Sequence, residues 1–207
     1  MKILIACEES QTVCKEFRAL GHEAYSCDIL PASGGHPEWH IQDNVLNHLK
    51  EGWDMMVAHP PCTHLAVSGA PHFHKKQKEQ IKAIRFVRYL LECNIPKICL
   101  ENPVSIISTQ IRKPDQIIQP FFFGDPIPKK TCLWLKNLPP LIPTKIVEPE
   151  YILYNSKKSK SGKSRYSVFG KLGKGKGKER SKTFPGIAKA MAEQWGNLSP
   201  TSNYGNQ

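Results

Sequence analysis

The chain has 207 residues, 40% of them hydrophobic, which is enough for one domain with a buried core, or one domain with a small appendage. No apolar run approaches the roughly 20 residues of a membrane span, and the N-terminal stretch "MKILIACEES" has no signal-peptide cleavage pattern. The seven cysteines are scattered without a C-x-x-C pair, which favours reduced thiols in a cytoplasm over a disulfide framework or a zinc ribbon.

The net charge of +11 is concentrated in one segment. Residues 155–182 contain eleven Lys or Arg residues and one acid, Glu179, and so supply a net +10 of that total. A basic block beside a nearly neutral domain indicates a polyanionic partner, most simply nucleic acid. A solvated loop that is kept soluble by its charge is the alternative.

Short apolar runs bounded by turn residues predict the strands. We expect strands at residues 2–6, 23–30, 53–58, 97–101 and 131–135. The first predicted helix follows Ser10 as its N-cap and ends at Gly21, with Val13, Phe17 and Leu20 on its apolar face.

Two further helices are predicted. Residues 77–93 carry an apolar stripe formed by Ile81, Ile84, Val87, Leu90 and Leu91. Residues 185–197 open with a proline in the first turn and end at a glycine. Strands that alternate with helices predict an α/β fold, with a mostly parallel open sheet, helices on both faces and a small basic insert.

Polar residues follow the strands of this predicted sheet. Glu8 and Glu9 follow the first strand, Asp28 ends the second, Cys62 follows the third and Glu101 ends the fourth. Ligands of such sheets bind at the carboxyl ends of the strands, so one crevice is expected to collect all five residues.

The first turn, "ACEESQ", lacks the glycines that let backbone amides approach a pyrophosphate. An acidic turn repels phosphate, so the crevice suits a nucleoside without phosphates. Asp28 has the spacing of the acid that binds ribose hydroxyls in nucleoside-binding folds. An ordinary exposed acid at a strand end fits that spacing equally well.

Cys62 has three interpretations. Free cysteines are often buried in cores, but this one follows two prolines and so lies in a loop. His59 and His64 offer metal ligands beside it, with His72 and His74 nearby, but no fourth ligand converges and the sequence reads P-C-T-H-L where the zinc deaminases have P-C-x-x-C, so we expect no metal. A nucleophile needs exposure and a field that favours the thiolate. Glu101, in "LENP", is either a surface acid or a general acid in the same crevice.

In this order the motifs resemble those of the cytosine-C5 DNA methyltransferases. The stretch "HPPCTHLAVSGA" is similar to the P-P-C loop of that family, Glu101-Asn102-Pro103 to its E-N-V tripeptide, and "RSKTFPGIAKAMAEQW" (180–195) to its closing motif. The resemblance covers most of 1–145 and 180–197. It implies a Rossmann-like fold that binds S-adenosylmethionine, with 1–145 and 180–207 as the catalytic domain.

The resemblance also implies roles for residues. The Cys62 thiolate would attack C6 of a cytosine flipped from duplex DNA, Glu101 would assist at N3, and C5 would take the methyl group. The family's Q-x-R-x-R signature is not visible, and "PKKTCLWL" occupies its place, so Lys129 or Lys130 would substitute; we take Lys130 as the third catalytic residue. An exposed lysine pair is the alternative. The residues expected to bind the cofactor are Glu8, Glu9, Asp28, Asp43, Pro60, Thr183 and Pro185.

The family's large target-recognition domain is missing, and only residues 146–179 stand in its place. Lysines on phosphates give affinity without sequence readout, so we expect a short or relaxed target. The expected nucleic-acid contacts are Lys157, Lys158, Lys160, Lys163, Arg165, Tyr166, Lys174, Lys176, Lys178 and Arg180. A partner subunit or a dimer is a further way to complete target recognition.

So compact a form resembles phage or mobile-element enzymes that protect DNA from restriction, which places the protein in the cytoplasm of a bacterium or of a phage-infected cell. Two alternatives stay open. The chain is a non-catalytic protein that binds DNA or a defence factor, or it performs the same chemistry on RNA or free nucleotide.

Overall fold

The computed structural model describes residues 1–155, 163–167 and 182–198. One sheet is built from β1 (Lys2–Ala6), β2 (Glu23–Asp28), β3 (His40–Gln42), β4 (Met55–Ala58), β5 (Lys97–Pro103), β6 (Gln116–Ile118) and β7 (Thr131–Lys136). The strand order is β3-β2-β1-β4-β5-β7-β6. The first five strands are parallel, and β7 lies antiparallel between β5 and β6.

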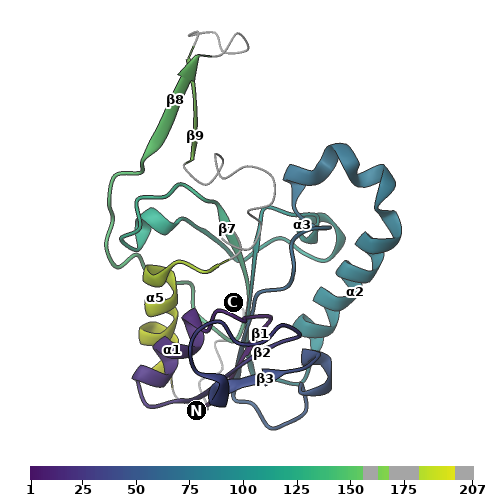
Figure 1. The fold of residues 1–207 in the computed structure, drawn as a ribbon, viewed down its shortest axis with the longest axis vertical. Helices are drawn as coiled ribbons and strands as arrows, with labels where there is room; N and C mark the ends of the chain where they lie inside the picture. The colour runs from purple at the N-terminus through teal and green to yellow at the C-terminus, as the bar shows by residue number, and fades with distance from the viewer. Residues whose placement is uncertain (156–162, 168–181, 199–207) are drawn as a thin grey trace.

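Helices cover both faces of this sheet (Figure 1). α1 (Thr12–Ala19) and α5 (Pro185–Gly196) pack together on one face, and α2 (Gln77–Glu92) and the short α3 (Ile107–Gln110) lie on the other. The chain therefore has a Rossmann-like, doubly wound α/β fold, and the predicted fold class is confirmed. Residues of α5 belong to the same buried cluster as residues of β1 and α1, although α5 lies far from them in the sequence.

The core follows from the alternation of side chains along buried strands. Ile3 and Ile5 of β1 belong to the cluster under α1 and α5, which also contains Phe17 and Trp195. Leu4 and Ala6 of the same strand belong to the cluster under α2. Because both faces are buried, β4 is apolar throughout and β1 is apolar after its first residue.

Most predicted elements are confirmed within a few residues, the usual uncertainty of element ends. β3 and β6 were not predicted. The apolar stripe of α2 is wrong in one position, because Ile81 is 62% exposed while Val87 and Leu90 are buried. All seven cysteines lie in the described part of the chain, and none of them is in a disulfide there. No helix in the described part is both long enough and apolar enough to cross a bilayer.

The start of α1 differs from the prediction. Ser10 is not the N-cap; that position is held by Gln11, whose φ is 57° and whose side chain does not cap the helix. The Glu8 carboxylate performs the capping instead. Leu20 is 46% exposed rather than buried. Gly21 ends the helix as predicted, with a φ of 80° that suits glycine.

A separate antiparallel hairpin projects from the body (Figure 1). It consists of β8 (Tyr151–Asn155) and β9 (Lys163–Ser167), neither of which was predicted. The segment before it is tied to the body, because Lys145 donates to the Phe122 carbonyl and Val147 to the Phe121 carbonyl. The projecting hairpin thus begins at Tyr151, within the expected insert 146–179.

Gly186 shows how tightly α5 is seated. A Cβ atom there would lie 2.0 Å from the Phe123 carbonyl oxygen. The Gly186 amide also donates to the Asp125 carboxylate at 3.2 Å, which satisfies one of the free amides of the first helical turn. The site therefore accepts no side chain without moving backbone.

Replacing Gly186 with alanine is expected to lower the free energy of unfolding by about 1–3 kcal/mol, because overpacking forces the backbone apart. Urea unfolding measures this. Gly69→Ala is the matched control, since its Cβ would meet only the Phe73 ring at an ordinary 3.7 Å. Equal losses in the two variants would contradict the close approach at Gly186.

Candidate active site

A cavity of about 420 Å³ opens at the carboxyl ends of β1, β2 and β4. The strand order reverses here, because β2 lies on one side of β1 and β4 on the other. Its walls combine acids with apolar side chains. They include Cys7, Cys27, Asp28 and Ile29 from the first two strand ends, Asp43 and Val45 beyond β3, Pro60, Pro61, His64 and Leu65 after β4, and Glu79, Lys82, Ala83 and Phe86 from α2. Three predicted cofactor residues, Asp28, Asp43 and Pro60, thus meet in one cavity.

The turn between β1 and α1 is built around a buried acid. The Glu8 carboxylate accepts hydrogen bonds from the amides of Val13 at 2.7 Å and Cys14 at 3.2 Å. Burial raises the pKa of Glu8, while the His59 charge and these two amides oppose the rise. Cys7 and Gln11 have φ angles of 61° and 57°, a strained region for residues other than glycine.

This arrangement excludes a phosphate at α1. In dinucleotide-binding folds the pyrophosphate lies at the amino end of the first helix. Here the Glu8 side chain already occupies two of those amides. Glu8 therefore shapes the turn from inside the protein, whereas Glu9 accepts a hydrogen bond from the Ser33 hydroxyl.

The two predicted aspartates differ in their surroundings. Asp28 uses one oxygen to accept a hydrogen bond from the Leu30 amide at 2.9 Å. Asp43 is bound by its own turn, where Asn47, the Asn44 amide and His48 all contact its carboxylate. The Asn47 side chain and the other hydrogen bonds lower the pKa of Asp43. Asp28 is consequently the better placed of the two to bind a ligand hydroxyl.

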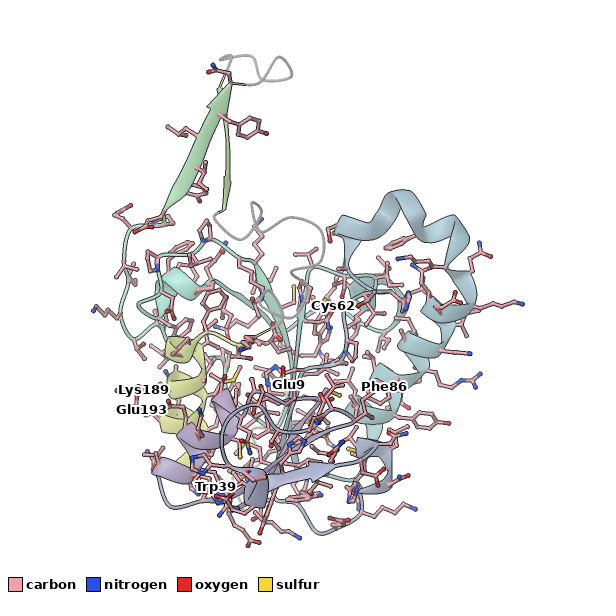
Figure 2. All side chains as sticks on the ribbon, in the orientation of Figure 1. Glu9, Trp39, Cys62, Phe86, Lys189 and Glu193 are labelled. Atoms are coloured by element: carbon pink, nitrogen blue, oxygen red, sulfur yellow. The ribbon has the colours of Figure 1, made fainter. Side chains whose placement is uncertain are left out.

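The two strands that flank β4, β1 and β5, hold the loop that carries Cys62. The His59 amide donates to the Ala6 carbonyl at 2.9 Å, and the Asn102 side chain donates to the Pro60 carbonyl at 2.9 Å. Cys62 follows at once and is partly exposed, and in the view of Figure 2 it lies nearer to the hairpin than Glu9 and Trp39 do. Core burial of Cys62 is therefore not observed. No group of three His, Cys, Asp or Glu side chains in the described residues is arranged to hold a metal ion.

Glu101 is paired with a histidine. Its Oε2 lies 3.2 Å from His59 Nδ1, and the two side chains are only 14% and 8% exposed. Burial alone would lower the pKa of His59, but the hydrogen bond and charge of Glu101, with the Glu8 charge, raise it. Burial alone would raise the pKa of Glu101, but His59 and then Lys129 lower it. Thr183 Oγ1 lies 3.5 Å from His59 Nδ1.

The two candidate lysines lie in different surroundings. The Lys129 charge lowers the pKa of both His59 and Glu101. Its ammonium lies 5.4 Å from the centre of the Phe184 ring. Lys130 is exposed, and its charge opposes the rise that burial causes in the pKa of Cys132. Thr183 approaches the His59–Glu101 pair, and Pro185 is exposed at the start of α5.

Most of the expected nucleic-acid residues lie outside the described residues: Lys157, Lys158, Lys160, Lys174, Lys176, Lys178 and Arg180. The backbone of β9 is described. Its register places Lys163 opposite Asn155, Arg165 opposite Leu153 and Tyr166 opposite Ile152.

Sequence reasoning missed several residues of this site. His59 was considered only as a metal ligand, and Asn102 only as part of the tripeptide that contains Glu101. On α2, Glu79, Lys82, Ala83 and Phe86 line the cavity. Their spacing of three, one and three residues marks one helical face, which was the available signal. That face could be assigned only once the start of α2 was placed beside the Cys62 loop.

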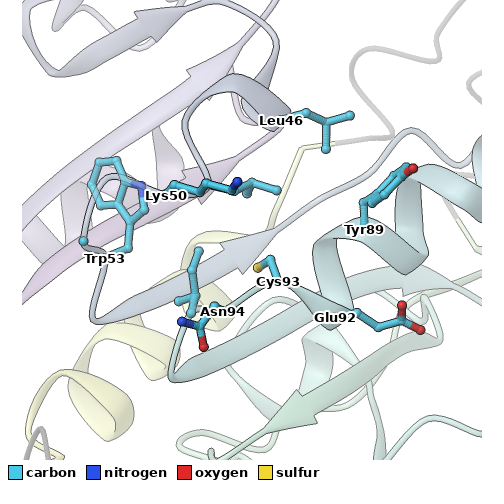
Figure 3. Close-up of a pocket in the computed structure, with 10 residues that line it drawn as sticks. Leu46, Lys50, Trp53, Tyr89, Glu92, Cys93 and Asn94 are labelled. Atoms are coloured by element: carbon cyan, nitrogen blue, oxygen red, sulfur yellow. The ribbon is translucent and has the colours of Figure 1, made fainter.

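A larger hollow, of about 690 Å³, lies at the opposite end of the sheet (Figure 3). Trp53, just before β4, and Tyr89 and Cys93, at the end of α2, line it. None of the buried side-chain atoms that lack a hydrogen-bond partner among the described residues belongs to its lining. In contrast, His64 Nδ1 is such an atom and lines the smaller cavity, which we therefore take as the candidate site.

No family model and no curated protein matches the chain. Among solved structures, a prophage-encoded "putative DNA modification methyltransferase" from E. coli matches with a TM-score of 0.46 and 13% identity. The match covers 70% of this chain and 51% of that one, so the chain spans about half the length of that protein. The fold assignment follows from the strand order of the sheet.

Replacing Asn102 with alanine is expected to lower the free energy of unfolding by about 1–3 kcal/mol, because the buried Pro60 carbonyl loses its donor. Urea unfolding provides the measurement. Asn197→Ala is the control, since Asn197 makes the same kind of bond to the Glu193 carbonyl at an exposed position. A loss at Asn102 no larger than at Asn197 would show that the loop is not held in this way.

Proposed function

We propose that this chain transfers a methyl group from S-adenosylmethionine to C5 of cytosine in DNA. One observation carries the proposal. Asn102 binds the loop that presents Cys62, while its neighbour Glu101 lies in β5, one residue beyond the last pair that this strand makes with β4. A thiol and a carboxyl group at neighbouring strand ends are the two groups that addition to a cytosine ring requires.

The cavity beside this loop fits the proposed cofactor. Its volume lies in the range of small-molecule sites. Ile29, Val45 and Phe86 provide apolar walls for a planar base, and Asp28 can accept hydrogen bonds from ribose hydroxyls. Glu8 closes the phosphate site, which favours a nucleoside with cationic groups. S-adenosylmethionine supplies an activated methyl group on a sulfonium centre.

The chain's own residues then act on the ring. C5 of cytosine is a poor nucleophile until a thiolate adds to C6, and Cys62 is the partly exposed thiol at this sheet edge. Glu101 holds N3 and offsets the charge that develops on the ring. The Lys129 charge, rather than that of Lys130, acts on Glu101, so we assign to Lys129 the supporting role first given to Lys130. A cytosine in a duplex must be flipped out to reach these groups.

The basic segment and the hairpin are the proposed DNA contacts. The described strand β9 carries Lys163 and Arg165, which belong to the block of net charge +10. On its partner strand, Leu153 is 69% exposed and Tyr154 44% exposed. A projecting ribbon with exposed apolar residues on one strand, and with basic residues in the sequence of the other, suits a surface that contacts phosphates and bases.

The decisive experiment is methyl transfer from labelled S-adenosylmethionine to mixed-sequence duplex DNA. We expect 5-methylcytosine, a covalent adduct with 5-fluorocytosine DNA, and a loss of about 10³-fold or more in Cys62→Ser. Cys93→Ser is the matched control, because Cys93 lies at the end of α2, beside the larger hollow.

Parallel assays on single-stranded DNA, tRNA and dCTP decide the substrate class. Product on RNA or nucleotide alone would overturn the DNA assignment and keep the chemistry. The absence of product and adduct on every substrate would overturn the enzymatic proposal in favour of a binding protein.

Asp28→Asn is expected to weaken S-adenosylmethionine binding by about 10- to 100-fold, since hydrogen bonds to a charged group contribute about 1.5–3 kcal/mol. Calorimetry measures the Kd. Glu23→Gln, at the exposed amino end of the same strand, should leave it unchanged. Equal affinities in the Asp28 variant and the unaltered protein would remove Asp28 from the proposed site.

A further inference from the structure

His59 is a polar group that the proposed reaction has not yet used. It directly follows β4, and its ring is 8% exposed. Its Nδ1 contacts Glu101 at 3.2 Å and Thr183 at 3.5 Å, and its Nε2 is buried and has no hydrogen-bond partner among the described residues. The polar contacts of the ring are therefore made through Nδ1.

We propose that His59 supplies, through Glu101, the proton that cytosine N3 takes up when Cys62 adds to C6. This inference rests on the proposed function. His59 is a positioning residue and proton source that acts through Glu101, which is the group expected to contact the base.

Charged groups from three segments face the pair. Glu8 reaches it from the turn after β1, Glu101 belongs to β5, and Lys129 approaches from the segment before β7. Thr183, in front of α5, adds a hydroxyl. The two acids favour an imidazolium at His59 and raise its pKa, whereas Lys129 opposes the rise.

Glu101 alone is a poor proton donor here. His59 and Lys129 lower the pKa of Glu101, so at neutral pH its carboxylate is ionised. An ionised carboxylate can accept a hydrogen bond from the base but has no proton for N3. An imidazolium in hydrogen-bond contact with it removes that difficulty.

The proton and electron balance closes. The Cys62 sulfur–C6 bond forms, and the C5–C6 π pair bonds C5 to the methyl group as the methyl–sulfonium bond breaks and leaves its pair on that sulfur. One proton passes from His59 Nδ1 to the ionised Glu101 carboxylate and from there to N3. Water then takes the C5 proton, the sulfur–C6 bond breaks, and N3 gives its proton back to the pair. One proton is released for each methyl group transferred.

The test is the pH dependence of single-turnover methyl transfer in the full chain. His59 is charged below its raised pKa, so the rate in the unaltered protein should fall as pH rises through that value. His59→Asn keeps a donor near the Nδ1 position but cannot lose a proton. It should lower the rate by about 10- to 100-fold near pH 7 and abolish this alkaline fall.

Lys129→Met is the second variant, and the direction of its effect on the pH profile is predicted. It removes the charge that lowers the pKa of His59, so the alkaline fall should move to higher pH. Lys113→Met, an exposed lysine in the loop before β6, should leave the fall in place. The Lys129 variant keeps the test decisive even if the buried His59 variant fails to fold.

The outcomes separate the two proposals. Methyl transfer with the same pH profile in the unaltered protein and in both variants would overturn the role of His59 and leave the proposed function standing. No transfer by the unaltered protein at any pH would overturn both. A shift of the alkaline fall to lower pH in Lys129→Met would also contradict the role of His59.

Discussion

The Glu8 carboxylate accepts hydrogen bonds from the Val13 and Cys14 amides, and this buried contact decides what the rest of the crevice can be. It fixes the start of α1 without the usual glycines and places a negative group where such folds otherwise bind phosphate. The same charge favours the protonated form of His59. One side chain thus occupies two amides at the start of α1 and also favours the protonated form of His59.

Strand alternation explains how a short loop serves both regions. In β5, Cys99 belongs to the core under α1 and α5 and Leu100 to the core under α2. Side chains two residues apart share a face, so Glu101 follows Cys99 toward Thr183, and Asn102 follows Leu100 toward Pro60. Pro60 lines the cavity and His59 faces Glu101. The loop therefore crosses the edge of the sheet between the proposed cofactor cavity and the proposed acid.

Periodicity was enough to predict the long apolar elements, the strand that ends at Asp28, the strand before the Cys62 loop and the strand that contains Glu101, because burial on both faces leaves a continuous apolar run. It could not reveal β3 or β6, which have three residues each. Ser10 was mistaken for the N-cap because the group that replaces it, Glu8, reaches α1 from outside the helix. The choice between Lys129 and Lys130 depended on where β7 begins. Two identical neighbouring residues do not show which of them faces the site.

The hairpin limits what a DNA contact could read. Each of its strands has five residues, so the ribbon is about 17 Å long, about half of the 34 Å helical repeat of B-DNA. An isolated two-stranded ribbon is at best marginally stable in water, and Leu153 and Tyr154 are exposed on it. Under the proposed contact, the duplex would supply the packing that the ribbon lacks. A ribbon of that length spans about five base steps of 3.4 Å, so a short target follows from its size, with the basic residues adding affinity that is independent of sequence.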